Sequence, residues 1–516
     1  MASTQTPADA AAAAGDTECT AGEKPAADAG SETTLAGEAK GEATDDSDDA
    51  RWEVTWDGPD DPGNPMNLST ARKWITTVIC SVGALNVACS SSIYTATYDG
   101  IEAAFGASQI EAITGLTLFV FGMGAGPMFY APLSEFYGRR IIYLISFTFF
   151  LAFQFPVAFA HNITGVLVNR LLGGLSGSAF MSVAGGTVAD MFPKKDLGMP
   201  MMVFTAAPFL GPSIGPLIGD FVAYRTSWRH VFYVMIAWVG TMLVLITFAV
   251  PETFAPVLLK RRAIARRKDT GDDRYYAPIE RMNRSVLGTV AFSCRRPFEL
   301  LVRDMMVFCL CLYTSILLGT MYLFFEAFPL VFINNHGFSS MHTGMTFLGL
   351  LVGMIMGMST EPLWKRQYNK LSRLRNDQGK PEYRLPQAMV GGPFVTIAIF
   401  WFAFTQYKSV PWIVPILSGV PFGFGMLLVF SGVFTYLVEA YRPFSASALA
   451  ANGFMRSSFA AAFPLFSIQM YNKLGYTWAS ALLGFLSLGC LPFPFLFYKY
   501  GERLRARSKF AWSDDN

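Results

Sequence analysis

Twelve apolar runs, each about 18 residues or longer, are the feature that most limits the fold of this chain. A run of this length is what a helix needs to cross the hydrocarbon core of a bilayer. Hydrophobic residues make up 52% of the 516 positions and charged residues only 15%, which excludes an ordinary soluble domain. The sequence therefore predicts an all-α polytopic membrane protein with twelve transmembrane helices. The expected spans are 75–96, 110–132, 141–160, 163–189, 200–222, 231–251, 305–330, 342–362, 386–406, 412–438, 447–471 and 477–499.

A polar stretch rich in basic residues divides these spans into two sets of six. The residues before the first span hold 16 acidic side chains and few apolar ones, so we expect them to be a disordered acidic tail. The expected parts are the tail at 1–65, a first six-helix half at 66–251, a basic cytoplasmic linker at 252–304, a second half at 305–499 and a cytoplasmic tail at 500–516.

The basic residues orient the chain. With the N-terminus placed inside, 31 of the 40 Lys and Arg residues fall in cytoplasmic connections and flanks, and 4 fall in outer loops. The positive-inside rule then places both termini in the cytoplasm. The net charge of +2 gives no indication of a nucleic-acid partner. We expect a multi-pass protein of the plasma membrane, with the vacuolar membrane as the alternative, that is embedded in lipid as a monomer.

One expected span carries a stripe of helix breakers. Residues 207–219 read APFLGPSIGPLIG, with prolines and glycines that each recur every four residues. Proline costs about 3 kcal/mol in a soluble helix interior, but neighbouring helices satisfy the freed carbonyls in a membrane. Glycines on one face let another backbone come close. The stripe predicts a tightly packed span, and a purely structural kink is the alternative reading.

No arrangement typical of an enzyme occurs in the chain. Seven cysteines lie in the tail, the spans or the linker, without metal-ligand spacing, and no phosphate-binding loop or nucleophile and base pattern is found. We expect neither catalysis nor a metal or other cofactor.

Five motifs carry a resemblance to a known family. They are VTWDGPDDPGNPMNLSTARKW at 54–74, APLSEFYGRR at 131–140, VNRLLGGLSGSA at 168–179, LGPSIGPLIGD at 210–220 and PETFAPVLLKRR at 251–262. From about residue 54 to about 500 the chain resembles the fungal twelve-span drug:proton antiporters of the major facilitator superfamily. The resemblance implies two parallel six-helix halves with substrate bound between them near the midplane. It also implies that the stripe, Gly211, Pro212, Gly215, Pro216 and Gly219, is the antiporter motif of span five.

Four residues inside the spans are candidates for proton coupling and substrate binding. Arg170 lies in span four, where a bare arginine costs about 2.5–3.5 kcal/mol on insertion scales, so it needs a partner or a cavity. The resemblance implies a role in proton coupling for Arg170, and a structural arginine is the alternative. Glu326 lies among phenylalanines in span seven and could exchange a proton or pair with a cationic substrate. Tyr322 and Arg456 complete the set, the latter as a contact for an anionic substrate.

A second set of candidates lies at the inner ends of spans. Glu135, Gly138, Arg139 and Arg140 follow span two, and an acid there can engage positive helix ends or basic partners on the opposite half. We expect this contact to stabilise the outward-facing state until transport breaks it. Asp190, Glu361 and Glu439 end spans four, eight and ten, and we expect them to form a related charge network.

The resemblance implies a secondary active transporter. It would exchange protons for a small organic molecule, such as a drug, a polyamine, an organic acid or a secreted secondary metabolite, and export it by alternating access. A proton symporter that imports its substrate and a non-transporting receptor are the alternatives. The charge of the substrate stays open, because Glu326 would suit a cation and Arg170 or Arg456 an anion.

Overall fold

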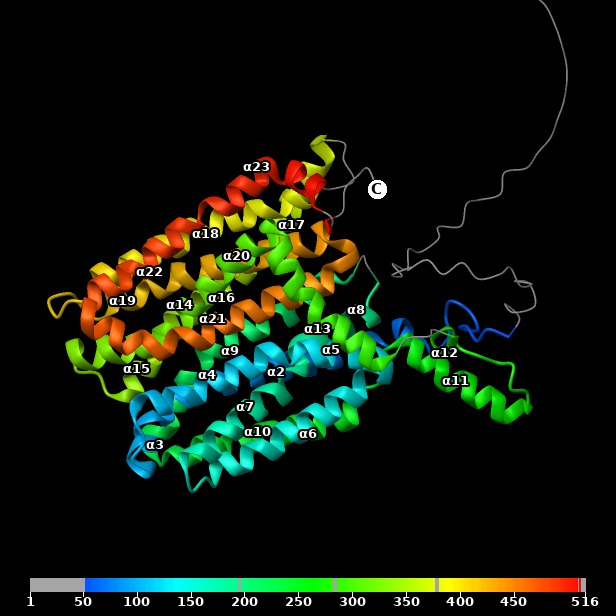
Figure 1. Ribbon diagram of the computed structural model, residues 1–516, viewed down its shortest axis with the longest axis horizontal. Coiled ribbons are helices and arrows are strands. Elements are labelled where there is room, and N and C mark those ends of the chain that lie inside the picture. The colour runs from blue at the N-terminus through cyan, green and yellow to red at the C-terminus, as the bar shows by residue number, and fades with distance from the viewer. Residues whose placement is uncertain (1–51, 194–195, 282–284, 376–379, 509, 512–516) are drawn as a thin grey trace, which may run out of the picture. The chain divides into compact units, whose positions relative to one another are not determined.

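The computed structural model describes residues 52–193, 196–281, 285–375, 380–508 and 510–511, and these residues are almost entirely helical. The first half runs from blue to green in Figure 1. Its helices are α2 (Thr70–Ser92), η2 (Ile93–Thr97), α3 (Tyr98–Phe105), α4 (Gln109–Ala125), α5 (Pro127–Tyr137), α6 (Arg139–Ala158), α7 (Ile163–Gly177), α8 (Ala179–Met191), α9 (Gly198–Arg225) and α10 (Trp228–Ala249).

The second half repeats this pattern. It lies beside the first half and ends in red in Figure 1. Its helices are α14 (Met305–His336), α15 (Ser340–Thr346), α16 (Leu348–Ser359), α17 (Glu361–Arg375), α18 (Leu385–Phe404), α19 (Ile413–Leu417), α20 (Gly419–Ala440), α21 (Ser445–Leu474), α22 (Tyr476–Cys490) and α23 (Pro492–Arg507).

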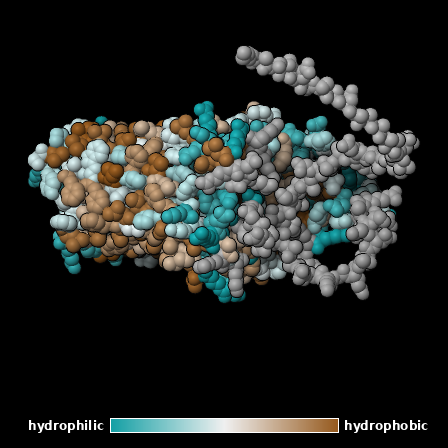
Figure 2. Space-filling view, turned by 90° about the horizontal axis from the view of Figure 1, so that it is seen from above, coloured by the Kyte–Doolittle hydropathy of each residue, from teal (hydrophilic) through white to brown (hydrophobic). Residues whose placement is uncertain are grey.

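Among the described residues, 11 helical segments, some of them built from two or three consecutive helices, are long and apolar enough to cross a membrane. They correspond to all the expected spans except 447–471, which is the 30-residue helix α21. Helix α21 is less apolar because it carries Asn452, Arg456 and several serines. Figure 2 shows hydrophobic side chains over the flank of the bundle, as a lipid-facing surface requires.

The last helix runs further than expected. We placed a cytoplasmic tail from residue 500, but α23 continues to Arg507. Arg505 is only 2% exposed and donates from Nε to Glu382 Oε1 over 2.8 Å. This buried pair holds the end of α23 against the 3-10 turn Pro381–Arg384 that precedes α18, and the helix extends about two turns past the boundary predicted at 499.

The two ends of the bundle differ. We call the end next to residues 252–304 the linker end, and the end that carries α3, α15 and α19 the far end (Figure 1). The linker contains α11 (Ala255–Thr270), α12 (Pro278–Arg281) and α13 (Val286–Arg303). Helix α13 packs on α5 and α21, where Phe298 and Phe454 meet edge to face at 5.1 Å between ring centroids.

Part of the expected tail is ordered against the linker. Residues 1–51 lie outside the described residues, whereas residues 52–65, which we expect to belong to the disordered tail, take up defined contacts. Val54 donates its N–H to the Tyr276 carbonyl over 2.9 Å and buries its side chain with Ala263. Arg262 of α11 donates to Asp61 over 2.5 Å and also pairs with Asp57. We call residues 52–69 the leader. Its carboxylates bind the basic side chains of α11, and composition alone did not predict this contact.

Candidate functional site

Arg170 joins three helices of the first half. Its side chain is 1% exposed and donates to the carbonyls of Gly115 and Ser90 over 3.3 and 3.0 Å. The guanidinium also lies over the rings of Tyr94 and Phe119, at 4.4 and 4.1 Å from their centroids. No described carboxylate pairs with Arg170. Arg170 therefore has backbone carbonyls and aromatic faces as its partners. These contacts link α7 to α2 and α4.

Glu326 and Tyr322 lie on one face of α14 at the boundary between the halves. The Tyr322 hydroxyl and Ser91 Oγ are 2.7 Å apart, a hydrogen bond between the second and the first half. Glu326 is one turn further along and 6% exposed, and its Oε1 has no hydrogen-bond partner among the described residues. The Tyr98 hydroxyl lies beside this carboxyl. We call Arg170, Tyr94, Tyr98, Tyr322, Ser91 and Glu326 the far layer.

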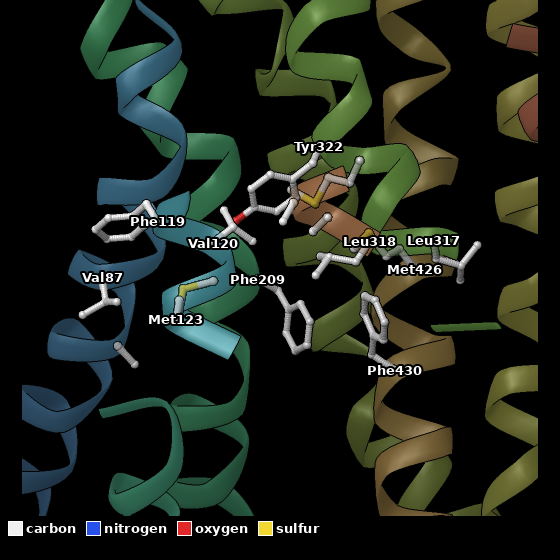
Figure 3. Close-up of a cluster of buried hydrophobic side chains, with 14 of the residues drawn as sticks. Val87, Phe119, Val120, Met123, Phe209, Leu317, Leu318, Tyr322, Met426 and Phe430 are labelled. Atoms are coloured by element: carbon white, nitrogen blue, oxygen red, sulfur yellow. The ribbon is translucent and has the colours of Figure 1, made fainter. Parts of the chain in front are cut away.

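Arg456 lies closer to the linker end, in a separate layer. Its guanidinium carbon is 5.4, 5.5 and 5.2 Å from the ring centroids of Phe209, Phe430 and Phe434. Phe209 belongs to α9 of the first half and stacks on Phe430 of α20, with 4.7 Å between centroids. Figure 3 shows these two rings facing each other across the boundary between the halves. We call Arg456, Phe209, Phe430 and Phe434 the middle layer.

The glycine stripe packs α9 on the first span. A Cβ atom at Gly211 would lie 2.5 Å from Ala88 Cβ, and one at Gly219 would lie 2.8 Å from Ile93 Cγ1. Gly215 is tighter still, since its Cβ would lie 1.9 Å from Ser92 Oγ and 2.7 Å from the Ile93 backbone nitrogen. Pro212 and Pro216 are buried within the same continuous helix. The close approach expected from the stripe is confirmed, and the neighbour is the span formed by α2 and η2.

At the linker end, an acid that we did not single out caps the start of α6. Glu252 accepts the backbone N–H groups of Arg139 and Arg140 over 2.9 and 3.2 Å. Gly138, at φ 96°, has no room for a side chain because a Cβ would lie 2.3 Å from the Glu252 carboxylate. Arg139 also donates to Asp190 over 3.2 Å. We expected a gating role for Gly138, Arg139, Arg140 and Asp190. In this conformation their contacts lie within the first half.

The second half repeats this pairing. Arg384 precedes α18 and donates to Glu439 at the end of α20 over 2.7 Å, as Arg139 at the start of α6 does to Asp190 at the end of α8. Glu361 accepts from Gln387 Nε2 over 2.9 Å. Because α6 and α18 are the third spans of their halves, the charged pairs follow the internal repeat. In this conformation Asp190, Glu361 and Glu439 each form contacts within their own half.

The expected contact of Glu135 with the other half is not made in this conformation. Glu135 is exposed, and no described residue pairs with it. By contrast, the halves touch at the far end, where a Cβ at Gly344 would lie 2.9 Å from the Pro216 carbonyl oxygen. Thr117 Oγ1 also donates to the Ala461 carbonyl over 2.7 Å. The halves are joined from the middle of the bundle to the far end.

Several residues of the site were not predicted from the sequence. Phe209, Phe430 and Phe434 are ordinary aromatic positions in apolar spans, and only packing brings them around Arg456. Tyr98 lies just beyond the expected first span, in the continuation α3. Glu252 did have a signal, because it is the acid of the PETF motif that opens the linker.

Comparison with known proteins agrees with this architecture. The family model described as Major Facilitator Superfamily matches residues 80–464. A relative described as efflux pump atB, from Aspergillus terreus, is 46% identical over 495 residues, with 94% of each chain covered. A relative described as probable drug/proton antiporter YHK8, from Saccharomyces cerevisiae, is 42% identical over 87% of each chain.

Solved structures show the same fold. The xylose transporter XylE from E. coli superimposes with a TM-score of 0.58 at 16% identity, covering 84% of this chain and 98% of that chain. Identity this low carries the fold alone, whereas the sequence relatives are similar along almost their whole length. The chain belongs to the major facilitator superfamily, in the family of fungal twelve-span drug:proton antiporters.

Proposed function

We propose that this chain exports a small organic molecule in exchange for protons, by alternating access between the linker end and the far end. The family membership and the relatives described as an efflux pump and a drug/proton antiporter support this function. The single observation that carries the mechanism is a buried carboxyl, Glu326, one turn from the Tyr322–Ser91 hydrogen bond that joins the halves. Proton exchange and contact between the halves then occur in one place.

Glu326 is the proton-exchanging group in this proposal. A carboxylate without a partner is costly in an apolar environment, whereas the neutral acid is not, so gain or loss of a proton changes the local energy strongly. The carboxyl lies beside the Tyr98 hydroxyl, and Tyr98 belongs to the same cluster as Arg170. Arg170 contributes by fixing the Ser90 carbonyl and the Tyr94 ring, which keeps the first-half side of the far layer in place.

The pairs at the linker end keep each half rigid while the halves rock. Arg139–Asp190 and Arg384–Glu439 both lie within one half, so they need not break during the transition. Glu135 is free to bind the opposite half when the linker end closes. Arg139 holds α5 against α6 by donating to Ser134 Oγ, while Gly138 and Arg140 lie against Glu252 at the start of α6. Glu361 is anchored to Gln387 at the linker end of the second half.

The placement in the cell follows from the charge pattern. Basic residues gather at the linker end, so we assign this end to the cytoplasm, with both termini there, in the plasma membrane. The protein acts as a monomer in this proposal, with a substrate and protons as its partners, and it has no catalytic step.

Transport assays in cells test the proposal. A yeast strain without its major efflux pumps, with and without the full-length chain, is loaded with a panel of fluorescent dyes and radiolabelled organic acids. We expect lower accumulation of at least one compound in cells that carry the chain, and loss of this difference when a protonophore collapses the gradient. Higher accumulation would indicate import, and a difference that survives the protonophore would contradict proton coupling.

A further inference from the structure

Arg456 is a cation in the middle of the bundle that has no counter-charge among the described residues. It lies 11 residues from the start of α21, which is about 16 Å along the helix axis, roughly half of the hydrocarbon thickness. No described carboxylate forms an ion pair with it, no described group accepts a hydrogen bond from it, and its Nε is buried without a partner. A charge at this depth is expensive unless something pairs with it.

The groups around Arg456 leave this charge uncompensated. Phe209 comes from α9, and Phe430 and Phe434 come from α20. The α14 side supplies Tyr322 and Cys311. All of these described groups are neutral, and the aromatic faces stabilise the guanidinium without accepting a hydrogen bond from its N–H groups.

Arg170 is different in this respect. Its donors are directed at backbone carbonyls of α2 and α4, and it is 1% exposed. An anion would have to displace those carbonyls to bind it. Of the two arginines inside the spans, Arg456 is therefore the one whose guanidinium N–H groups are available to bind an anion.

Space is open beside Arg456 on the same helix face. Gly453 lies one turn before it, and a Cβ atom there would meet no atom within 4 Å. Leu449 lies one further turn toward the linker end, on the same face of α21 as Arg456. This face points toward α9 and α20, yet Leu449 is 37% exposed. Arg456 itself is not fully buried. A molecule can thus reach the guanidinium from the linker end along this face.

We infer that Arg456 binds the carboxylate of an organic anion whose aromatic or otherwise apolar body packs against Phe209, Phe430 and Phe434. A carboxylate accepts two parallel hydrogen bonds from a guanidinium, which is the interaction that Arg456 lacks. Because the rings come from both halves, the bound anion contacts both halves at once. The inference rests on the proposed export function and adds the chemical class of its substrate.

Ligand binding to the purified full-length chain in detergent tests this inference. Benzoate and 1-naphthoate are titrated against their neutral amides and against benzylamine, and the thermal unfolding midpoint is followed. We expect the two carboxylates to raise the midpoint and the amides and the amine to leave it unchanged. Arg456→Met should weaken carboxylate binding at least about tenfold, as loss of a charge-assisted pair predicts. The exposed Arg366→Met is the matched control and should bind as the native chain does.

The remaining outcomes each overturn the inference. Stabilisation by benzylamine, absence of stabilisation by both carboxylates, or carboxylate binding that survives Arg456→Met would show that Arg456 is not an anion site. If Arg456→Met does not fold, Arg456→Lys replaces it and should retain binding that is weakened, since lysine keeps the charge but not the paired donors. The dye and acid export assay separates the two proposals: proton-dependent export without anion binding leaves the proposed function standing, and the reverse result leaves the anion site standing.

Discussion

Ser91 and Tyr322 form a hydrogen bond of 2.7 Å that joins the first span to the seventh, and so the first half to the second. It lies one turn from Glu326, with Phe325 edge to face on the Tyr322 ring at 5.1 Å between centroids. The bond therefore belongs to the contact that must break when the far end opens.

Tyr322→Phe should favour opening of the far end. Loss of one buried hydrogen bond costs about 1 kcal/mol, which changes the ratio of closed to open molecules about fivefold. Spin labels at the exposed positions Ala103 and Ser340, one on each half, would report a larger population of long distances. Tyr313→Phe is the control on the same helix, because the buried Tyr313 hydroxyl has no hydrogen-bond partner in the described part of the chain. Equal distance distributions in the two variants would contradict the role of the bond.

Gly215→Ala should destabilise the first half. The new Cβ would lie 1.9 Å from Ser92 Oγ and 2.7 Å from the Ile93 nitrogen, so α9 must move away from the first span. Such overpacking costs about 1–3 kcal/mol and should lower the thermal unfolding midpoint and the export rate. Gly240→Ala in α10 provides a matched change, since nothing lies within 4 Å of a Cβ there. If a variant with a bulky residue at position 215 exported substrate at the native rate, the glycine stripe would have only a packing role.

Glu326→Gln should separate substrate binding from proton coupling. Glutamine keeps the shape of the side chain and cannot release a proton, so substrate-driven proton flux in proteoliposomes should fall by at least about tenfold if Glu326 is the general acid and base of the exchange. Binding of the substrate should persist. Glu299→Gln in the linker controls for a change of net charge, because Glu299 pairs with Arg303 within α13 and belongs to neither the far layer nor the middle layer. Proton flux that persists in Glu326→Gln would place the proton site elsewhere.

Asp61→Asn should release the leader from the linker. Hydrogen bonds from Arg262 and from backbone N–H groups lower the pKa of Asp61 from 3.8 to about 2. A lowered pKa in the folded state means that this contact contributes fully above about pH 4 and is lost as the pH falls toward 2. Across physiological pH the contact should thus be constant, and only the substitution removes it. Limited proteolysis of the leader would detect the release, and the exposed neighbour Asp60→Asn should be cleaved no faster than the native chain.

Apolar length and charge order determined most of the fold without tertiary information. The twelve runs predict spans because their length matches the thickness of a bilayer, in which a helix satisfies its own backbone groups, and the glycine stripe predicts a close neighbour. The same reasoning located Arg170, Glu326 and Arg456, since charged side chains inside an apolar run are few and easily seen.

What only the tertiary structure decided is which groups these residues meet. Arg170 is satisfied by the carbonyls of α2 and α4, Arg456 is surrounded by rings from both halves, and Asp57 and Asp61 bind a helix about 200 positions later. Helical period and hydropathy are local along the chain, whereas these contacts depend on how helices distant in sequence pack. The sequence alone therefore left the charge of the substrate open, and the empty donors of Arg456 point to an anion.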